Sequence, residues 1–572
     1  MNSTFYLIQR SALVGLIAAV ALAGAAQAAK VLNRGNGAEP YSLDPHRAVM
    51  TAENHIIGDM LMGLYTDDAN GKPILGAAER ADVSGDGLTW TFVLRPHTWS
   101  DGKPVVATDF VVALRRVLDP KTAAEYASVL YPLKNALKVN KGELALDKLG
   151  VKAVDAKTLV IELEHPAPFL PELLTHYTTF PIPKHVIEKH LSDWTRANKM
   201  VVNGPYKLAE WKPHDHIRLV KNERFYDAQN VKIDEVVYFP TDDDNAALKR
   251  YRAGEIDTQE RWPTSEHKWL SEHIPNEARR STQLSVYFTT FNLSRKPFDD
   301  LRVRKALAMA IDRGAIAKDV YQGVFGDAAD TLLPPGTASV DRSAKVAWSG
   351  WSMDQRRTEA KRLLAAAGFG ANKPLKLVYR YIGNPDIKRA AVAMQSMWRD
   401  VGVDVELSSS EAKVHWNLLQ VRDFDVAHNT WAFDYNDAKN LFFQFQAAAV
   451  QMNNAAYNSP AFEALLQRAD REPDAAERGR LLGQANAQLL ADLPAAPAIF
   501  PYARHLVKSY VLNWNDNPRD INRTRWLDIG TRTGPGAAAS GPGGEDVAGE
   551  TGFWSWLGSW FSSDAWRKWW NS

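Results

Sequence analysis

Apolar and polar residues alternate in the segment LTWTFVLR, residues 88–95. Every second position from Leu88 to Leu94 is apolar, and the positions between them hold two threonines and one valine. A period of two residues is typical of a strand that packs one face on a core. We therefore expect a half-buried β-strand here, followed by a turn at Asp101 and Gly102.

Helical spacing of apolar residues begins directly after that turn. The segment ATDFVVALRRVLDP, residues 107–120, predicts a helix that ends before Pro120. Thr108 or Asp109 is its expected N-cap, because short polar side chains accept hydrogen bonds from free backbone N–H groups. A second helix is expected in residues 299–313, with two aspartates at its positive N-terminal end.

The later part of the chain predicts α/β units. Asn384 is a good N-cap, Pro385 suits the first helical position, and Gly402 is a helix stop. Apolar runs on both sides make the order strand, helix, strand, and a helical crossover implies a parallel pair of strands. The three elements are expected in residues 375–382, 384–402 and 403–408.

Composition indicates an ordinary globular protein of more than one lobe. The chain has 572 residues, a net charge of +1 and 24% charged residues, so its charge gives no reason to expect nucleic acid. It contains no cysteine, which excludes disulfides, thiolate metal sites and a lipid-modified cysteine.

The N-terminus is typical of an exported protein. Arg10 precedes an apolar run, and the small residues Ala26 to Ala28 form a cleavage site. We expect a signal peptide in residues 1–28, cleaved near Ala28, and a periplasmic location. An N-terminal membrane anchor is the alternative interpretation.

Few motifs favour catalysis. The chain has no phosphate-binding glycine loop, nucleophile elbow or HExxH motif in the expected context. His214 and His216 would share a face of a strand, but no third ligand is evident, so we predict surface histidines and no metal. The acidic run Asp242–Asp244 is expected in a solvated loop. No enzymatic activity and no cofactor are predicted.

Several motifs together resemble one family. In chain order they are NGAEPYSLDPH, LTWTFVLRPHTWSDGKPVVATDF, NGPYKLAEW, YRAGEID, RVRKALAMAIDR and AKRLLAAAGF. They resemble family-5 extracellular solute-binding proteins, which are receptors of ABC importers, from about residue 31 to residue 528. YASVLY and NTWAFDYND look most similar to the oligopeptide-binding branch.

The resemblance implies an α/β fold, a two-lobed periplasmic-binding-protein clamp (type II-like, cluster C) with an extra β-rich subdomain. Ligand would be enclosed between the lobes, and the receptor would be a monomer that serves ABC permease subunits. The expected limits are 29–61, 193–312 and 502–534 for lobe I, 62–192 for the subdomain, and 313–501 for lobe II.

The resemblance also places a ligand site. An aspartate in the family's W-x-x-D-Y context binds the α-amino group of the ligand, and it corresponds to Asp434 beside Trp431 and Tyr435. Tyr287 matches an aromatic position that lines the cleft, and His428 stands where relatives carry an arginine. The alternative interpretation is that Asp434 pairs with a cation of its own chain or caps a turn.

The ligand's carboxylate partner stays open at this point. Lys388, Arg389 and Arg422 are candidates, each also interpretable as a surface charge. A peptide is the expected ligand. The alternatives are a metal chelate, haem, an opine or an oligosaccharide in the same fold, or a periplasmic chaperone or enzyme.

The C-terminal segment changes in character. Residues 535–552 are rich in glycine, alanine and proline, which predicts a flexible linker. Residues 553–572 predict an amphipathic tail in two short helical pieces that contacts the membrane surface. Its tryptophans are Trp554, Trp556, Trp560, Trp566, Trp569 and Trp570. A helix docked on its own protein, or a partner-binding motif, is the alternative.

Overall fold

The computed structural model describes residues 29–532. The expected signal peptide, the linker 535–552 and the tryptophan-rich tail 553–572 lie outside the described residues. Within residues 29–532, no helix is both long and apolar enough to cross a membrane.

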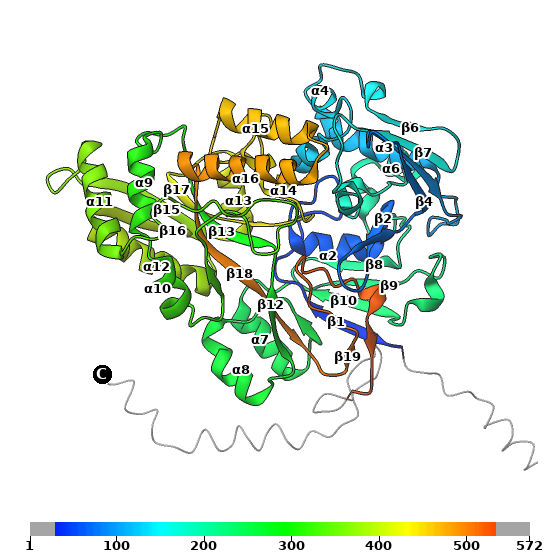
Figure 1. The fold of residues 1–572 in the computed structure, drawn as a ribbon. Helices are drawn as coiled ribbons and strands as arrows, with labels where there is room; N and C mark the ends of the chain where they lie inside the picture. Colours follow the sequence, from blue (N-terminus) through cyan, green and yellow to red (C-terminus); the bar gives the residue numbers. More distant parts are fainter. Residues whose placement is uncertain (1–28, 533–572) are drawn as a thin grey trace, which may run out of the picture. The chain divides into compact units, whose positions relative to one another are not determined.

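A large sheet of twelve strands organises the fold (Figure 1). Ten strands follow in the order β16-β15-β17-β13-β18-β11-β1-β10-β9-β8, and β12 and β14 also pair with β18. The strands are β1 (Val31–Gly35), β8 (Tyr206–Lys212), β9 (His216–Lys221), β10 (Glu235–Phe239), β11 (Thr258–Gln259), β12 (Ala278–Thr282), β13 (Ser285–Phe291), β14 (Gly326–Ala328), β15 (Leu375–Ile382), β16 (Val403–Ser410), β17 (Val426–Ala432) and β18 (Ala495–Val507).

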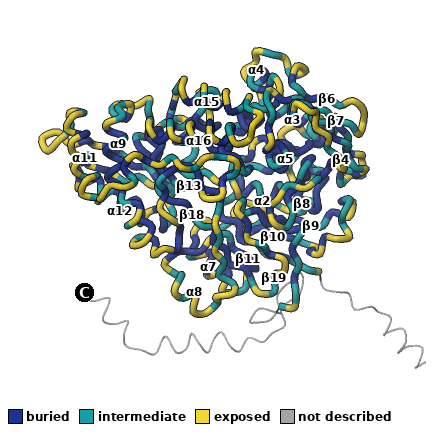
Figure 2. The backbone as a smooth tube through the Cα atoms, in the orientation of Figure 1, coloured by how far each residue is buried: buried dark blue, intermediate teal, exposed yellow. Residues whose placement is uncertain are grey.

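The long strand β18 connects two parts of this sheet. Its first half pairs with β13 and β14, and its second half pairs with β11 and β12. This strand contributes to two large apolar cores: Val507 belongs to the core that also contains residues from Leu32 to Tyr238, and Ala495 and Phe500 belong to the core that begins at Leu284. Figure 2 shows buried backbone in both parts.

A separate four-stranded sheet packs on the first core, in the order β4-β5-β7-β6. Its strands are β4 (Ala78–Val83), β5 (Thr89–Leu94), β6 (Val151–Ala153) and β7 (Thr158–Glu162), and a small hairpin is formed by β2 (Tyr65–Asp67) and β3 (Pro73–Leu75). The alternating pattern therefore predicted β5 correctly. This sheet lies within the segment expected to form the β-rich subdomain.

Helices surround both parts (Figure 1). The longer ones are α2 (Thr51–Met60), α3 (Ala107–Leu118), α6 (Lys184–His190), α7 (Asp244–Ala253), α8 (His267–His273), α9 (Leu301–Ala310), α11 (Met353–Ala366), α12 (Pro385–Asp400), α13 (Ala412–Gln420), α15 (Pro460–Arg471) and α16 (Ala475–Asp492). The short ones include α5 (Leu170–Leu173) and α14 (Lys439–Phe442).

The predicted N-cap was confirmed in α12 and was wrong in α3, and one of the two aspartates expected at the start of α9 is its N-cap. Asn384 accepts from the backbone of α12, and Asp300 caps α9. In α3, however, the N-cap is Val106, and Asp109 sits two residues inside the helix, where its carboxylate accepts from the Val106 N–H at 3.1 Å. An acidic side chain at the third helical position can accept a hydrogen bond from the backbone N–H of the N-cap residue, and Asp109 does this for Val106.

Two further predictions were wrong. His214 lies in the turn between β8 and β9, with a φ of +61°, so it does not share a strand face with His216. The acidic run is not wholly a solvated loop: Asp243 caps α7, and Asp244 is 2% exposed. A carboxylate is buried only where it is paired, and Arg261 pairs with it at 3.3 Å.

Candidate ligand-binding site

An unpaired strand edge lies beside Asp434. The strand β17 pairs with β13 along its whole length, but with β15 only at Val426 and Ala427. From His428 to Ala432, its second edge therefore has no partner strand among residues 29–532. Two side chains use part of this edge: His415 donates to the His428 carbonyl at 2.9 Å, and Asn429 Oδ1 accepts from the Thr430 N–H at 2.8 Å. Such an edge can accept an extended chain through main-chain hydrogen bonds.

Asp434 follows this edge and is largely buried, with 12% of its side chain exposed. Its carboxylate lies 3.3 Å from His176 Nε2 and accepts from the Asn440 amide at 3.2 Å. Arg519 donates to the backbone carbonyl of Asp434 at 2.8 Å, not to the carboxylate. Among the described residues, no lysine or arginine forms an ion pair with this carboxylate.

Trp431 forms an aromatic wall next to Asp434. Its ring stacks on Tyr126 at 6.2 Å and meets Phe443 edge-on at 5.4 Å. Its indole N–H donates to Asn440 Oδ1 at 2.9 Å, and the same oxygen accepts from the Asp434 N–H at 3.0 Å. Asn440 therefore positions both residues.

Tyr435 has a different environment. Its side chain is buried and stacks on Phe169 at 4.8 Å. The next residue, Asn436, donates its N–H to the Glu172 carboxylate. Tyr435 therefore packs between segments distant in the chain and offers a ligand little surface.

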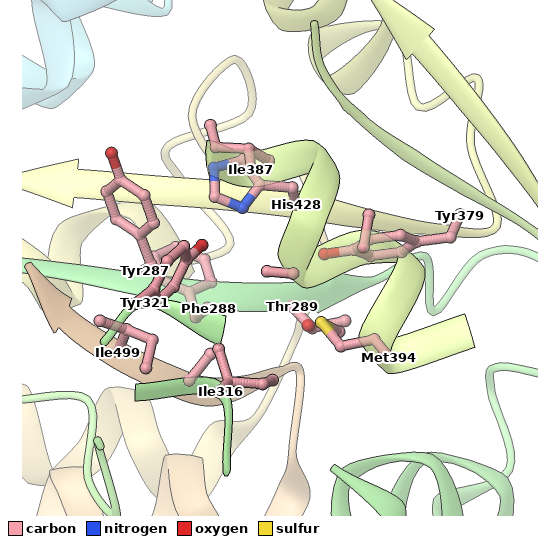
Figure 3. A pocket seen from close by; sticks show the side chains of 13 residues that line it. Tyr287, Phe288, Thr289, Ile316, Tyr321, Tyr379, Ile387, Met394, His428 and Ile499 are labelled. Atoms are coloured by element: carbon pink, nitrogen blue, oxygen red, sulfur yellow. The ribbon is translucent and has the colours of Figure 1, made fainter. Parts of the chain in front are cut away.

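Tyr287 of β13 and His428 of β17 line a cavity of about 30 Å³ (Figure 3). The volume suits roughly one water molecule. Their rings are 4.9 Å apart, and in Figure 3 the Tyr287 hydroxyl points away from Ile316 and Ile499. Burial lowers the pKa of His428 to about 3, so its imidazole is neutral at physiological pH and carries no charge for a ligand carboxylate.

The three residues considered as partners of the ligand's carboxylate have different surroundings. Arg389 donates to Asp386 and Thr264. Arg422 donates to the Asn453 carbonyl at 3.2 Å, and Lys388 is exposed on α12. The structure does not bring these three cations together with Asp434.

Residues missed in the sequence complete the site. Tyr126 and His176 stack on each other at 5.2 Å, and they come from the segment between β5 and β8. Tyr126 lies in YASVLY, which resembled the oligopeptide branch and could have indicated it. No local pattern points to His176.

Polar contacts join the first turn of α12 to α7, to β18 and to the segment that follows β11. Asp386, at the first turn of this helix, accepts from Arg504 at 3.1 Å and from the Thr264 hydroxyl at 2.9 Å. Its neighbour Asn384 donates to Asp244 at 2.9 Å. We call this set the α12 contact.

One cluster of described residues has a donor set that a metal could use. Glu260, His505 and Asp520 each place a donor atom within 4.8 Å of the others. However, His505 is paired with Asp520 at 2.6 Å and Arg34 lies 3.9 Å from Glu260, so positive charge is already present. The cluster forms an ion-pair network, and the absence of a metal stays a prediction.

Comparison with known proteins places the chain in a family. Residues 72–453 match "Bacterial extracellular solute-binding proteins, family 5 Middle". Over 507 residues the chain is 36% identical to the periplasmic oligopeptide-binding protein OppA of Escherichia coli, with 87% of this chain and 92% of that protein covered. It is 32% identical over 511 residues to a probable deoxycholate-binding periplasmic protein of the same organism, with 87% and 94% covered.

Solved structures have the same fold. OppA of Burkholderia pseudomallei superposes with a TM-score of 0.85 at 33% identity, covering 88% of this chain and 99% of that one. The Escherichia coli murein tripeptide-binding protein MppA gives 0.84 at 32% identity, covering 88% and 99%, whereas its unliganded open form gives 0.64 at 32%, covering 88% and 98%. The predicted two-lobed α/β clamp is thus confirmed. The structure of this chain resembles the unliganded open form of MppA less than it resembles the other MppA structure. The chain belongs to the family-5 bacterial extracellular solute-binding proteins.

Proposed function

We propose that this protein is an exported receptor that binds peptides between its lobes and delivers them to an ABC permease. The observation that carries the proposal is Asp434, a largely buried carboxylate at an open strand edge with no lysine or arginine paired to it. The α-ammonium of a peptide would supply that charge, whatever the peptide's sequence. The oligopeptide-binding names of relatives agree with this.

Peptide backbone would extend along the free edge of β17, where hydrogen bonds do not depend on side-chain identity. Trp431 and Tyr126 would flank its first residue. We place Tyr287 and His428 on the other side of the edge, as an uncharged wall. Tyr435 would support the site through Phe169 and not by direct contact. The protein would act as a monomer without cofactor or turnover of peptides.

Substitution of Asp434 tests the proposal. Asp434→Asn should weaken binding of peptides with a free N-terminus by roughly 2–5 kcal/mol, because it removes one member of a desolvated charge pair. The variant should also discriminate less against N-acetylated peptides in calorimetry. Asp404→Asn, on the exposed side of β16, is the control. Equal peptide affinity in the Asp434→Asn and unmodified proteins would contradict the assignment.

The ligand class has a direct test. Native mass spectrometry of the purified full chain should reveal a bound peptide. A bound steroid acid, metal chelate or sugar would instead favour the alternative of a non-peptide receptor, and the deoxycholate-binding relative gives that alternative its support.

The location in the periplasm, the residue limits of the lobes and membrane contact of the tail are parts of the same proposal. Six tryptophans with Arg567 and Lys568 suit the interface of an anionic membrane. Truncation after Gly534 should leave peptide affinity unchanged and reduce co-sedimentation with anionic vesicles. Failure of the full chain to co-sediment would rule out the anchor.

A further inference from the structure

The histidine beside Asp434 is presented by a different part of the molecule. His176 precedes Tyr177, which belongs to one of the two large apolar cores, whereas Phe433, next to Asp434, belongs to the other. The two side chains meet at 3.3 Å, between His176 Nε2 and Asp434 Oδ1. The contact therefore depends on how the two cores are arranged.

The imidazole of His176 is held in one orientation. Its ring stacks on Tyr126 at 5.2 Å and lies 4.0 Å from the Tyr177 ring, and only 2% of the side chain is exposed. The His176 carbonyl accepts from the Thr179 hydroxyl at 2.8 Å, which fixes the backbone as well. A side chain that is already packed in this way can direct a hydrogen bond with little further loss of conformational entropy.

The hydrogen bonds of the ring show which nitrogen carries the proton. Nδ1 of His176 accepts from the Thr178 backbone N–H at 3.5 Å and lies 2.9 Å from the Thr178 hydroxyl. A backbone N–H can only donate, so Nδ1 is an acceptor and the proton of the neutral ring is on Nε2. His176 therefore donates an uncharged N–H to Asp434. An imidazolium would place a second N–H against that of Thr178.

The second oxygen of Asp434 also has an uncharged donor. Asn440 donates its amide to Oδ2 at 3.2 Å. Arg519 donates to the backbone carbonyl of Asp434 and pairs with the carboxylate of Asp67. Each carboxylate oxygen of Asp434 thus has one neutral donor and keeps further acceptor capacity, since a carboxylate has about four lone-pair positions. The group is oriented, and its negative charge stays available.

A nearby ion pair shows what a cation does to such a group. Asp437, three residues further along the chain, accepts two hydrogen bonds from Arg478, at 2.8 and 3.1 Å. That bidentate pair leaves Asp437 no charge to offer a ligand. A lysine or arginine in place of His176 would pair with Asp434 in a similar way and would compete with the ammonium group of a ligand.

We infer that His176 is a positioning residue of the ammonium site, which orients Asp434 through an uncharged N–H and so leaves the positive charge to be supplied by the ligand. The inference rests on the proposed peptide-binding function and adds a reason for its selectivity toward a charged N-terminus. Because the donor and the acceptor belong to different parts of the molecule, the carboxylate is fully oriented only where the two apolar cores meet.

Peptides that differ only in the N-terminal charge measure this role. Trialanine, tetraalanine and pentaalanine are prepared with a free and with an acetylated N-terminus, and calorimetry is carried out with the full chain after removal of co-purified ligand. The measured quantity is the ratio of the two affinities, free over acetylated, for the length that binds best. His176→Phe keeps an aromatic ring but removes the donor, so the ratio should fall about tenfold, the usual size of one hydrogen bond to a charged group.

Further variants separate this role from packing. His176→Gln loses the ring but can donate from an amide nitrogen at the place of Nε2, so it should restore the ratio to within about threefold of the unmodified protein. His176→Lys brings a cation, which should pair with Asp434 and lower the ratio to about one. His97→Phe is the control, because His97 is also a buried histidine, and its ring contacts the Arg95 carbonyl at 2.9 Å. Thermal unfolding of each variant verifies that it is folded.

An unchanged ratio in folded His176→Phe or His176→Lys protein would overturn the inference alone. So would a His176→Gln protein whose ratio is as low as that of His176→Phe, since packing of the ring would then account for the loss. Equal binding of free and acetylated peptides by the unmodified protein, or binding of none of them, would overturn the proposed function, and the inference with it.

Discussion

Buried aspartates near the site differ in where their countercharge comes from. Asp67 is paired with Arg519 at 2.7 Å, and Asp437 is paired with Arg478 at 2.8 Å. Asp434 has no such partner among the described residues. A buried carboxylate needs a positive charge or hydrogen bonds nearby to offset the cost of its burial. Asp67 and Asp437 therefore belong to structural ion pairs, whereas Asp434 is available to a cation of the ligand.

One ion pair predicts how stability depends on pH. Burial alone would lower the pKa of His505, but Asp520 at 2.6 Å more than offsets it and raises the pKa to about 9, with Glu260 and Asp516 acting in the same direction. The value in the unfolded chain is about 6.5. The folded state therefore binds the proton more tightly, and this stabilisation is fully present below about pH 6.5 and is lost as pH rises through about 9.

Urea unfolding at a series of pH values measures this effect. The free energy of unfolding should fall by an amount on the order of 3 kcal/mol between pH 6.5 and 9.5, and His505→Gln should flatten the decline. His216→Gln, at a partly exposed position, is the control. A variant at His505 with the same pH slope as the unmodified protein would contradict the assignment.

At the scale of elements, the first turn of α12 does two things at once. Asn384 accepts from the N–H groups of Asp386 and Ile387, which caps the helix, and it donates to Asp244 in the other part of the molecule. The cap of α11 is a matched case without that second contact: Ser352 accepts from the Gln355 N–H. The two caps can therefore separate helix stability from the α12 contact.

We predict that Asn384→Ala and Ser352→Ala each lower the free energy of unfolding by about 1 kcal/mol, the usual cost of losing an N-cap. Only Asn384→Ala should also weaken peptide binding, because it removes the hydrogen bond by which α12 is joined to Asp244 of α7. Urea unfolding and calorimetry measure the two effects. Equal losses of affinity in both variants would show that the α12 contact has no specific part in binding.

At the scale of the molecule, contacts between distant segments occur on two sides of the site. Phe169 stacks on Tyr435 on one side, and Asp386 accepts from Arg504 on the other. The lower similarity to the open form of a relative agrees with such an arrangement. A ligand that contacts both lobes only in the closed arrangement would stabilise that arrangement relative to the open one.

Small-angle X-ray scattering tests this closure. Saturating peptide should decrease the radius of gyration of the truncated chain that ends at Gly534. Asp386→Asn should enlarge the ligand-free form and weaken binding, because Arg504 loses a buried partner. Asp404→Asn again serves as the control. Scattering that is identical with and without peptide would exclude a closure of this kind.

Strands and helix ends were predicted correctly where they depend only on residues close together in the sequence. The alternation in LTWTFVLR predicted β5, and the Asn384–Pro385 pair predicted where α12 begins, since a cap needs only residues within one turn. The parallel pairing of β15 with β16 followed from the crossover helix. His214 was placed wrongly because a three-residue turn interrupts the strand pattern there.

The sequence by itself therefore determined the elements, the mixed α/β class and the family, and it indicated Asp434 as a candidate for ligand binding, which stays a prediction. Only the tertiary structure decided that Asp434 meets His176 and that Asp244 is buried beside Arg261. The reason is physical. The burial of a side chain and the countercharge beside it depend on which distant segments pack together, and the pattern of neighbouring residues does not determine that packing.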